Sequence, residues 1–160
     1  MDKELSFVGN MTLDFAKQIA EWVYTDEYAV YNMPSFTEMV NKNYSLVNPE
    51  RAKDFLCFAL NNELVGYVKI NKKPNNIIFL GIGLKPNLTG KGLGKKVLTA
   101  GIEQALFSYP NVKLMLEVRS WNARAIKCYT AVGFKEVETK TVTDHLGNQA
   151  EFVIMEYVKG

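Results

Sequence analysis

The chain is poor in cysteine and histidine, which argues against a disulfide framework and against a zinc site. Its 160 residues include two cysteines, Cys57 and Cys128, and one histidine, His145. Two thiols make no disulfide framework, and we expect both to be reduced and buried in a cytoplasmic protein, with a single disulfide as the alternative. One histidine without cysteine partners cannot supply the three or four ligands typical of a zinc site, so we expect no metal.

Long apolar runs and an excess of either charge are also missing. No segment reaches the roughly 18 apolar residues of a membrane-spanning helix, and the apolar run at the N-terminus is too short for a signal peptide. The 19 basic and 17 acidic residues nearly cancel. We therefore expect neither a membrane nor a nucleic acid as partner, and a single domain over residues 1–160 without repeats or linkers.

Hydrophobic periodicity predicts a mixed α/β fold. Three-to-four-residue spacing favours helices, and alternation or short apolar runs favour strands. The predicted order is α, α, β, β, β, α, β, α, β, β, which indicates a mixed sheet with helices on both faces. The helices are expected at 13–24, from Ser35, at 93–105 and at 123–132, and the strands at 55–60, 64–70, 77–84, 112–118, 135–143 and 150–158.

The most informative segment runs from Ile77 to Gln104. An apolar strand containing glycine leads through a turn at Pro86 into a glycine-spaced loop and then a helix. A glycine-rich turn before a helix N-terminus is typical of phosphate binding, because free N–H groups and the helix dipole favour an anion there. A purely structural turn is the alternative. The loop and first helical turn are Thr89, Gly90, Lys91, Gly92, Leu93, Gly94 and Lys95.

This loop matches neither of two common nucleotide motifs. A Walker A loop needs Ser or Thr after Gly-Lys, but Lys96 follows Lys95. A dinucleotide fingerprint needs a third glycine where Lys95 stands. The segment instead resembles the acyl-CoA pyrophosphate loop of the GNAT-type N-acyltransferases, [QR]xxGx[GA], although Thr89 stands where that family usually has Gln or Arg.

A second segment, Leu114 to Phe134, strengthens the resemblance. The family's second signature is a strand that ends in Asn, followed by Ala, Tyr and Gly-Phe at set spacing. The matching residues here are Asn122, Ala125, Tyr129, Gly133 and Phe134. Asn122 also suits a helix N-cap and Gly133 a helix end. The resemblance covers roughly Phe55 to the C-terminus.

The resemblance implies a GNAT fold and acetyl-CoA as co-substrate. In that fold the strands at 77 and 112 splay apart, and acyl-CoA enters the wedge. The pantothenate arm would pair with the strand edge at Ile82, Gly83 and Leu84, and its pyrophosphate would bind at Thr89 to Lys95. Asn122 would bond the CoA arm as well as cap its helix. The strand glycines fit a bulge or a close approach by another backbone, or they relieve crowding against helices.

The resemblance also implies direct acetyl transfer to an amine. An N–H near Leu84 could stabilise the oxyanion, and Tyr129 would protonate the leaving thiolate. The alternative is that Tyr129 packs in the core. Glu117 is a candidate base and equally a surface carboxylate, and His145 is a weaker candidate.

The acceptor site would be built by the first two helices and their connection. The segment from Trp22 to Tyr31 is dense in aromatic rings and carries carboxylates, which suits an ammonium substrate. A helix-end cluster packed on the sheet is the equal alternative. The candidate acceptor residues are Tyr24, Glu27, Tyr28 and Tyr31.

Three readings of the function follow. The leading one is a cytoplasmic N-acetyltransferase acting on a primary amine of a small molecule or peptide. The second is a silent acyl-CoA-binding module that acts as a sensor or scaffold. Nucleic-acid binding through Lys91, Lys95 and Lys96 is the weakest. A homodimer is also expected, with the C-terminal strands, such as Phe152 to Val158, as the pairing edge.

Overall fold

The structure, a computed structural model, describes residues 4–88, 92–144 and 146–158. The chain forms two compact units, which we describe one at a time. The first unit comprises Met1–Lys69 and Ile82–Val97, and the second comprises Ile70–Gly81 and Leu98–Gly160. The expectation of a single domain stays a prediction.

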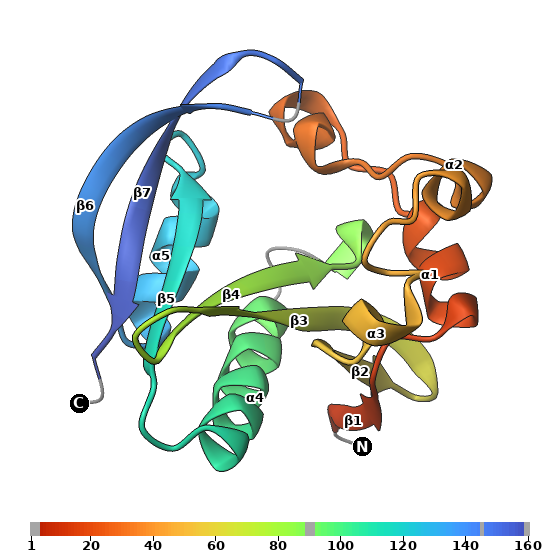
Figure 1. Cartoon of the computed structure of the whole chain (residues 1–160), viewed down its shortest axis with the longest axis horizontal. Coiled ribbons are helices and arrows are strands. Elements are labelled where there is room, and N and C mark those ends of the chain that lie inside the picture. The colour runs from red at the N-terminus through yellow and green to blue at the C-terminus, as the bar shows by residue number, and fades with distance from the viewer. Residues whose placement is uncertain (1–3, 89–91, 145, 159–160) are drawn as a thin grey trace. The chain divides into compact units, whose positions relative to one another are not determined.

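The strands form one mixed sheet of seven, in the order β1-β2-β3-β4-β5-β7-β6 (Figure 1). The strands are β1 (Ser6–Gly9), β2 (Phe55–Leu60), β3 (Glu63–Lys73), β4 (Ile77–Leu84), β5 (Lys113–Arg119), β6 (Phe134–Thr143) and β7 (Gln149–Tyr157). The α-helices are α1 (Leu13–Ala20), α2 (Phe36–Asn41), α3 (Pro49–Ala52), α4 (Leu93–Ser108) and α5 (Ala123–Val132), and two 3-10 helices are η1 (Asp26–Tyr31) and η2 (Pro86–Leu88).

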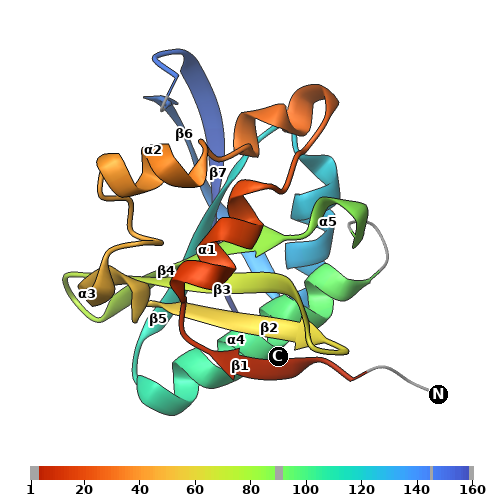
Figure 2. The same cartoon turned by 90° about the vertical axis from the view of Figure 1, so that its right-hand side faces the viewer.

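In the first unit, β1, β2 and the first part of β3 lie side by side as antiparallel neighbours (Figure 2). The β2–β3 turn places Asn61 and Asn62 at φ values of 50° and 65°. Asparagine tolerates this left-handed conformation better than most side chains, and two such residues make a turn whose twist suits a hairpin. The hairpin predicted from the sequence is confirmed.

Helices cover both faces of β3 within the first unit. A Cβ built on Gly66 would lie 3.2 Å from Val97 of α4, so α4 packs against that face. The next residue, Tyr67, points to the opposite face, where it packs against the core cluster that includes Trp22 and Ile19. Adjacent residues of a strand point to opposite faces, so the sequence Gly66-Tyr67 assigns α4 to one face and α1 to the other.

In the second unit, β7 lies between β5 and β6 and is antiparallel to both (Figure 1). The start of β4 is parallel to β5, with Ile77 opposite Lys113 and Phe79 opposite Met115. Helix α5 begins at its N-cap Asn122, whose side chain accepts a hydrogen bond from the N–H of Ala125. It ends at Gly133, where φ is 128°. Both ends of α5 therefore form as the sequence predicts.

The predicted fold class, a mixed α/β sheet with helices, is confirmed, but some elements differ from the prediction. The sequence did not predict β1 or α3. The first helix was expected to reach Tyr24 but ends at Ala20, so Val23 is 64% exposed instead of facing the core. The chain leaves the helix because Trp22 turns into the core, where it is 7% exposed.

Two finer expectations need correction. The edge from Phe152 to Val158 cannot pair two copies, since both sides of β7 are already hydrogen-bonded; a homodimer by another surface stays a prediction. Both cysteines are free thiols, but only Cys57 is buried and Cys128 is half-buried. The predicted splay between the two central strands also stays a prediction. Among the described residues, no helix is both long and apolar enough to cross a membrane.

Candidate active site

The C-terminal end of β4 presents backbone groups along one edge. The N–H of Lys85 donates to the carbonyl of Val65 on β3 at 2.8 Å. Because polar backbone groups alternate sides along a strand, Gly83 also faces β3, whereas the N–H and C=O groups of Ile82 and Leu84 face the opposite edge. The predicted pantothenate edge therefore has the right polarity: a strand-like arm could pair with Ile82 and Leu84.

One of the residues predicted to bind the acceptor amine reaches this edge. The hydroxyl of Tyr24 donates to the carbonyl oxygen of Leu84 at 2.6 Å, across 60 residues of sequence. The Tyr24 backbone is itself held by Asn32, whose Oδ1 accepts from the Tyr24 N–H at 2.6 Å and whose Nδ2 donates to the Tyr24 carbonyl at 3.2 Å. Asn32 was not predicted as a site residue. Its side chain closes the loop that contains η1 and fixes where the aromatic segment meets β4.

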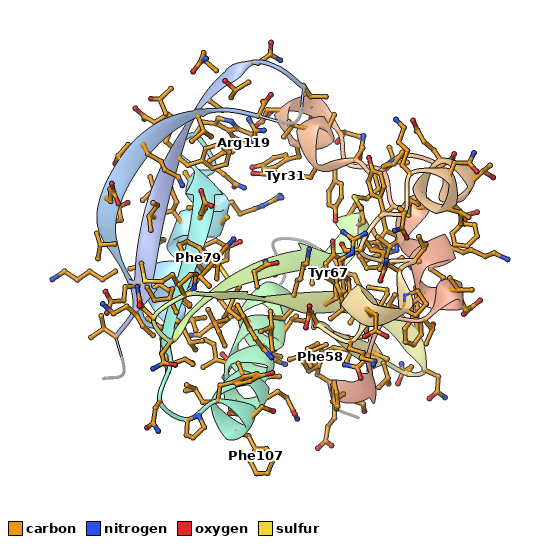
Figure 3. The ribbon with its side chains drawn as sticks, in the orientation of Figure 1. Tyr31, Phe58, Tyr67, Phe79, Phe107 and Arg119 are labelled. Carbon is orange, nitrogen blue, oxygen red and sulfur yellow. The ribbon has the colours of Figure 1, made fainter. Side chains whose placement is uncertain are left out.

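The side chain of Tyr67 leaves no room for any residue larger than glycine at position 83. A Cβ at this position would lie 2.1 Å from Cε2, 2.3 Å from Cζ and 2.7 Å from Oη of Tyr67. Tyr67 is labelled in Figure 3. The ring of Tyr67 therefore occupies the place of a side chain at position 83. Crowding against helices, one explanation offered by the sequence, is therefore not what a side chain at Gly83 would meet first, and a bulge or a close approach by another backbone stays a prediction. At Gly66, by contrast, a Cβ would meet both Val97 and the Gly83 carbonyl oxygen.

The Tyr67 ring is wedged among other aromatic rings. It stacks on Trp22 at a centroid distance of 6.3 Å and tilts against Phe55 at 5.6 Å. Burial raises the pKa of Tyr67 to about 12, and burial likewise raises the pKa of the opposite Cys57 thiol to about 12. Both groups therefore stay protonated at neutral pH, so neither supplies a base or a thiolate there.

The start of α4 also lies in the first unit. The carbonyl of Gly92 accepts from the N–H of Lys96, and Gly92 has a φ of 78° with nothing within 4 Å of a built Cβ. A glycine before the helix has no side-chain oxygen of its own to cap the first turn, and uncapped N–H groups at such a position favour an anion. Leu93 is buried, Gly94 half-buried and Lys95 exposed. Thr89, Gly90 and Lys91 lie outside the described residues.

The other predicted acceptor residues lie on η1. Tyr31 is 37% exposed and meets Tyr24 edge to face at 6.4 Å. Glu27 is exposed and Tyr28 is half-buried. The aromatic segment is therefore neither a fully packed helix end nor a bare surface. It presents rings and a carboxylate while Tyr24 anchors it to the end of β4.

In the second unit, two residues of the second signature, Asn122 and Tyr129, belong to the start and the body of α5. Asn122 is 7% exposed and caps α5. Tyr129 is half-buried on α5, and its ring meets Phe134 edge to face at 6.4 Å. The Tyr129 ring therefore packs on Phe134, and the catalytic role of its hydroxyl stays a prediction.

Glu117 points away from the buried layer of β5. It is exposed between the buried Leu116 and Val118, as its alternation predicts. Its carboxylate lies 3.2 Å from the Lys140 ammonium on β6. To reach a substrate, the carboxylate would have to give up this contact. The role of Glu117 as base stays a prediction, with this ion pair against it. His145 lies outside the described residues.

A buried ion pair in the second unit was not predicted. Nη2 of Arg119, at the end of β5, lies 3.1 Å from Oδ2 of Asp144, and the two side chains are 10% and 5% exposed. The guanidinium also lies 5.2 Å from the Phe152 ring centroid. Oδ1 of Asp144 accepts from the N–H groups of Leu146 and Asn148. The pair therefore fastens the β6–β7 turn to the end of β5.

This turn gives a prediction for acid stability. The pKa of Asp144 is lowered first by the hydrogen bond from the Asn148 N–H and further by Arg119 and Leu146. A lowered folded-state pKa adds stability that is present above the unfolded-state value of about 3.9 and is lost as the pH falls through the folded-state value. We expect Asp144→Asn to lower the melting temperature at pH 7, and the gap to wild type to shrink towards pH 3.

Thermal melts between pH 7 and pH 3 measure this gap. The control is the same substitution at the exposed Asp14, which should leave the melting temperature nearly unchanged at every pH. A gap for Asp144→Asn that stays constant down to pH 3 would contradict the assigned role of the Asp144 charge.

Comparison with known proteins decides the family. The model of the acetyltransferase (GNAT) family matches residues 16–134. The chain belongs to this family. The match includes both segments on which the sequence resemblance rested, the glycine-spaced loop and the segment that ends at Phe134. A search among curated proteins finds no match.

Solved structures agree on the GNAT fold. A GNAT acetyltransferase from Bacillus anthracis is 13% identical with a TM-score of 0.79, covering 99% of this chain and 97% of that one. An aminoglycoside acetyltransferase in complex with coenzyme A is 23% identical with a TM-score of 0.68, covering 94% of each chain. A ribosomal-protein alanine N-acetyltransferase from Escherichia coli is 22% identical with a TM-score of 0.64, covering 98% and 93%.

The carboxylates and thiols of the described residues do not gather into a metal site. Within residues 4–88, 92–144 and 146–158, no group of three or more His, Cys, Asp or Glu side chains could hold a metal ion. What the described site offers is a backbone edge, tyrosine hydroxyls and the start of a helix. These groups suit an extended, amide-bearing anionic ligand better than a cation.

Proposed function

We propose that this protein transfers the acetyl group of acetyl-CoA to a primary amine of a small molecule or peptide, by direct attack in a ternary complex. The observation that carries the proposal is the edge of β4 at Leu84. The backbone N–H and C=O of Leu84 face away from β3, and the Tyr24 hydroxyl donates to the Leu84 carbonyl. Family membership and a solved relative that holds coenzyme A support acetyl-CoA as co-substrate.

Each part of the acetyl donor has residues that fit it. Ile82 and Leu84, on either side of Gly83, would pair with the amide-bearing arm. The start of α4, from Gly92 to Lys95, would bind the pyrophosphate together with Thr89, Gly90 and Lys91. Asn122, as in the family motif, would bond the arm of CoA.

The reaction needs three further groups from the chain: one that stabilises the oxyanion, an acid and a base. The amine nitrogen attacks the thioester carbon, the C–S bond breaks, and the thiolate takes a proton. An N–H near Leu84 would stabilise the oxyanion, and Tyr129 would give the proton to sulfur. Glu117 is kept as the proposed base, either directly or through water, with Lys140 as its competing partner.

Tyr129→Phe tests the acid. The substitution removes one hydroxyl and keeps the ring that packs on Phe134. We expect turnover to fall by roughly a hundredfold or more, because positioned proton transfer contributes that much, and CoA binding to stay nearly unchanged. Thiol release measures turnover and calorimetry measures CoA binding. Unchanged turnover would remove Tyr129 from the mechanism.

The acceptor would bind against the aromatic segment. Tyr24, Tyr28 and Tyr31 supply rings, and Glu27 supplies negative charge, which together suit an amine in its cationic form before deprotonation. Solved relatives named for a ribosomal-protein alanine, an aminoglycoside and spermidine suggest three amine classes to try.

One experiment tests the whole proposal. Acetyl-CoA binding is measured by calorimetry, and free-thiol release is then followed with spermidine, an aminoglycoside and a peptide that begins with alanine. Binding with amine-dependent release is the expected result. Binding without release from any amine would favour an acyl-CoA sensor, and no binding would refute both roles.

A further inference from the structure

The hydroxyl of Tyr67 has no assigned role, yet it lies beside the centre of the candidate site. Its oxygen would be 2.7 Å from a Cβ built on Gly83, which precedes Leu84. The rest of the ring is enclosed by Trp22 and Phe55. An apolar wall with one polar tip is typical of a ligand site, where a few polar groups fix orientation.

The hydroxyl is within reach of solvent. Every buried side-chain nitrogen or oxygen of the described residues has a hydrogen-bond partner. None of the hydrogen bonds found for these residues involves the Tyr67 hydroxyl. Its oxygen is therefore not sealed in the core, since a sealed hydroxyl without a partner would stand out as unsatisfied. Tyr67 as a whole is half-buried, and its oxygen lies beside Gly83.

The face of β3 that carries Tyr67 is the face of the acceptor segment. Gly66 points to α4, whose first turn is the proposed pyrophosphate site, and Tyr67 points the other way, to Trp22. Trp22 leads directly into Tyr24, whose hydroxyl lies at Leu84. The Tyr67 hydroxyl therefore faces the side from which an acceptor would come, not the side of the pyrophosphate.

We infer that the Tyr67 hydroxyl holds the acceptor amine by a hydrogen bond, with the amine beside the hydroxyl and next to the Leu84 edge. The inference rests on the proposed acetyl transfer and adds a residue that selects and orients its acceptor. In the neutral amine, an N–H donates to the tyrosine oxygen and the nitrogen lone pair remains for the thioester carbon. No proton leaves the hydroxyl at neutral pH, so Tyr67 positions the amine and is not its base.

The absence of a side chain at Gly83 fits this role. With a side chain at 83, the Tyr67 ring could not keep its present position, and its hydroxyl could not stay beside Gly83. The glycine therefore leaves room for the tyrosine ring next to the residue that precedes Leu84.

The test compares Tyr67→Phe with Tyr109→Phe as matched control. Tyr109 is a half-buried tyrosine whose ring lies under Lys72 and which has no part in the proposed site. Kinetics use the best amine of the panel, spermidine, an aminoglycoside or an alanine peptide. We expect Tyr67→Phe to raise the KM for the amine by roughly tenfold, the loss of one hydrogen bond, with the KM for acetyl-CoA and the melting temperature unchanged.

A purely structural tyrosine gives a different pattern. An unchanged KM for the amine, or equal rises in both KM values, would overturn the inference, as would a melting temperature that falls. Failure of the proposed function is separate, because wild type would then release no thiol with any amine. In that event, calorimetric titration of the same amines into wild type and Tyr67→Phe in the presence of CoA still decides, and equal affinities would refute the role of the hydroxyl.

Discussion

Gly83→Ala is expected to destabilise the fold by about 3 kcal/mol, the upper part of the range for overpacking a tight core. The new methyl carbon would lie 2.1 Å from Cε2 of Tyr67, far inside contact distance. A tyrosine ring elsewhere could swing away, but this one is held between Trp22 and Phe55. Chemical denaturation, with equal slopes for the two proteins, measures the loss.

A double-mutant cycle shows whether the ring is the cause. Tyr67→Ala alone should cost several kcal/mol because it opens a cavity beside Trp22. In the Tyr67→Ala background, Gly83→Ala should cost little, since the atoms that the methyl would strike are gone. The two losses should therefore add to much more than the loss in the double variant. Simple additivity would mean that position 83 is restricted by something other than the Tyr67 ring.

The elements that could be predicted from the sequence are those that local chemistry decides. Asn61 and Asn62 predicted a hairpin turn because both can adopt positive φ. Asn122 and Gly133 predicted the two ends of α5. Helix α3 carried a similar signal, since the Asn48 side chain accepts from the N–H groups of Glu50 and Arg51 and a proline follows it. A helix of four residues has too little periodicity to draw notice.

The parts of the site that could not be predicted depend on contacts between distant segments. Tyr24 was a candidate because of the aromatic rings around it, and Leu84 because of its strand, but nothing local indicates that the one bonds the other across 60 residues. Gly83 was noticed as a glycine, yet its cause is a ring on the neighbouring strand. Asn32 and Arg119 gave no signal at all, because a single polar side chain has no pattern.

Gly92→Val is expected to weaken CoA binding by about a hundredfold, which corresponds to roughly 3 kcal/mol or one to two charge-assisted hydrogen bonds. A built Cβ at Gly92 meets nothing within 4 Å, so a valine there would project into open space at the start of α4. That space is where an anion would have to approach the N–H groups of the first turn. Calorimetry measures the affinity of each variant for CoA and for pantetheine, which has the arm of CoA without its pyrophosphate. Only the affinity for CoA should fall.

Backbone strain must be separated from blocking, because Gly92 has a φ of 78° and valine resists positive φ. The chain contains a matched control in Gly147, which has a φ of 82° and likewise nothing within 4 Å of a built Cβ, in the β6–β7 turn. Gly147→Val should lower the melting temperature about as much as Gly92→Val, by the same strain of roughly 1–2 kcal/mol, and should leave CoA affinity unchanged. If both variants lose CoA binding equally, strain is the cause and the start of α4 is not the pyrophosphate site. Loss in Gly92→Val alone would assign the anion to the N–H groups that follow Gly92.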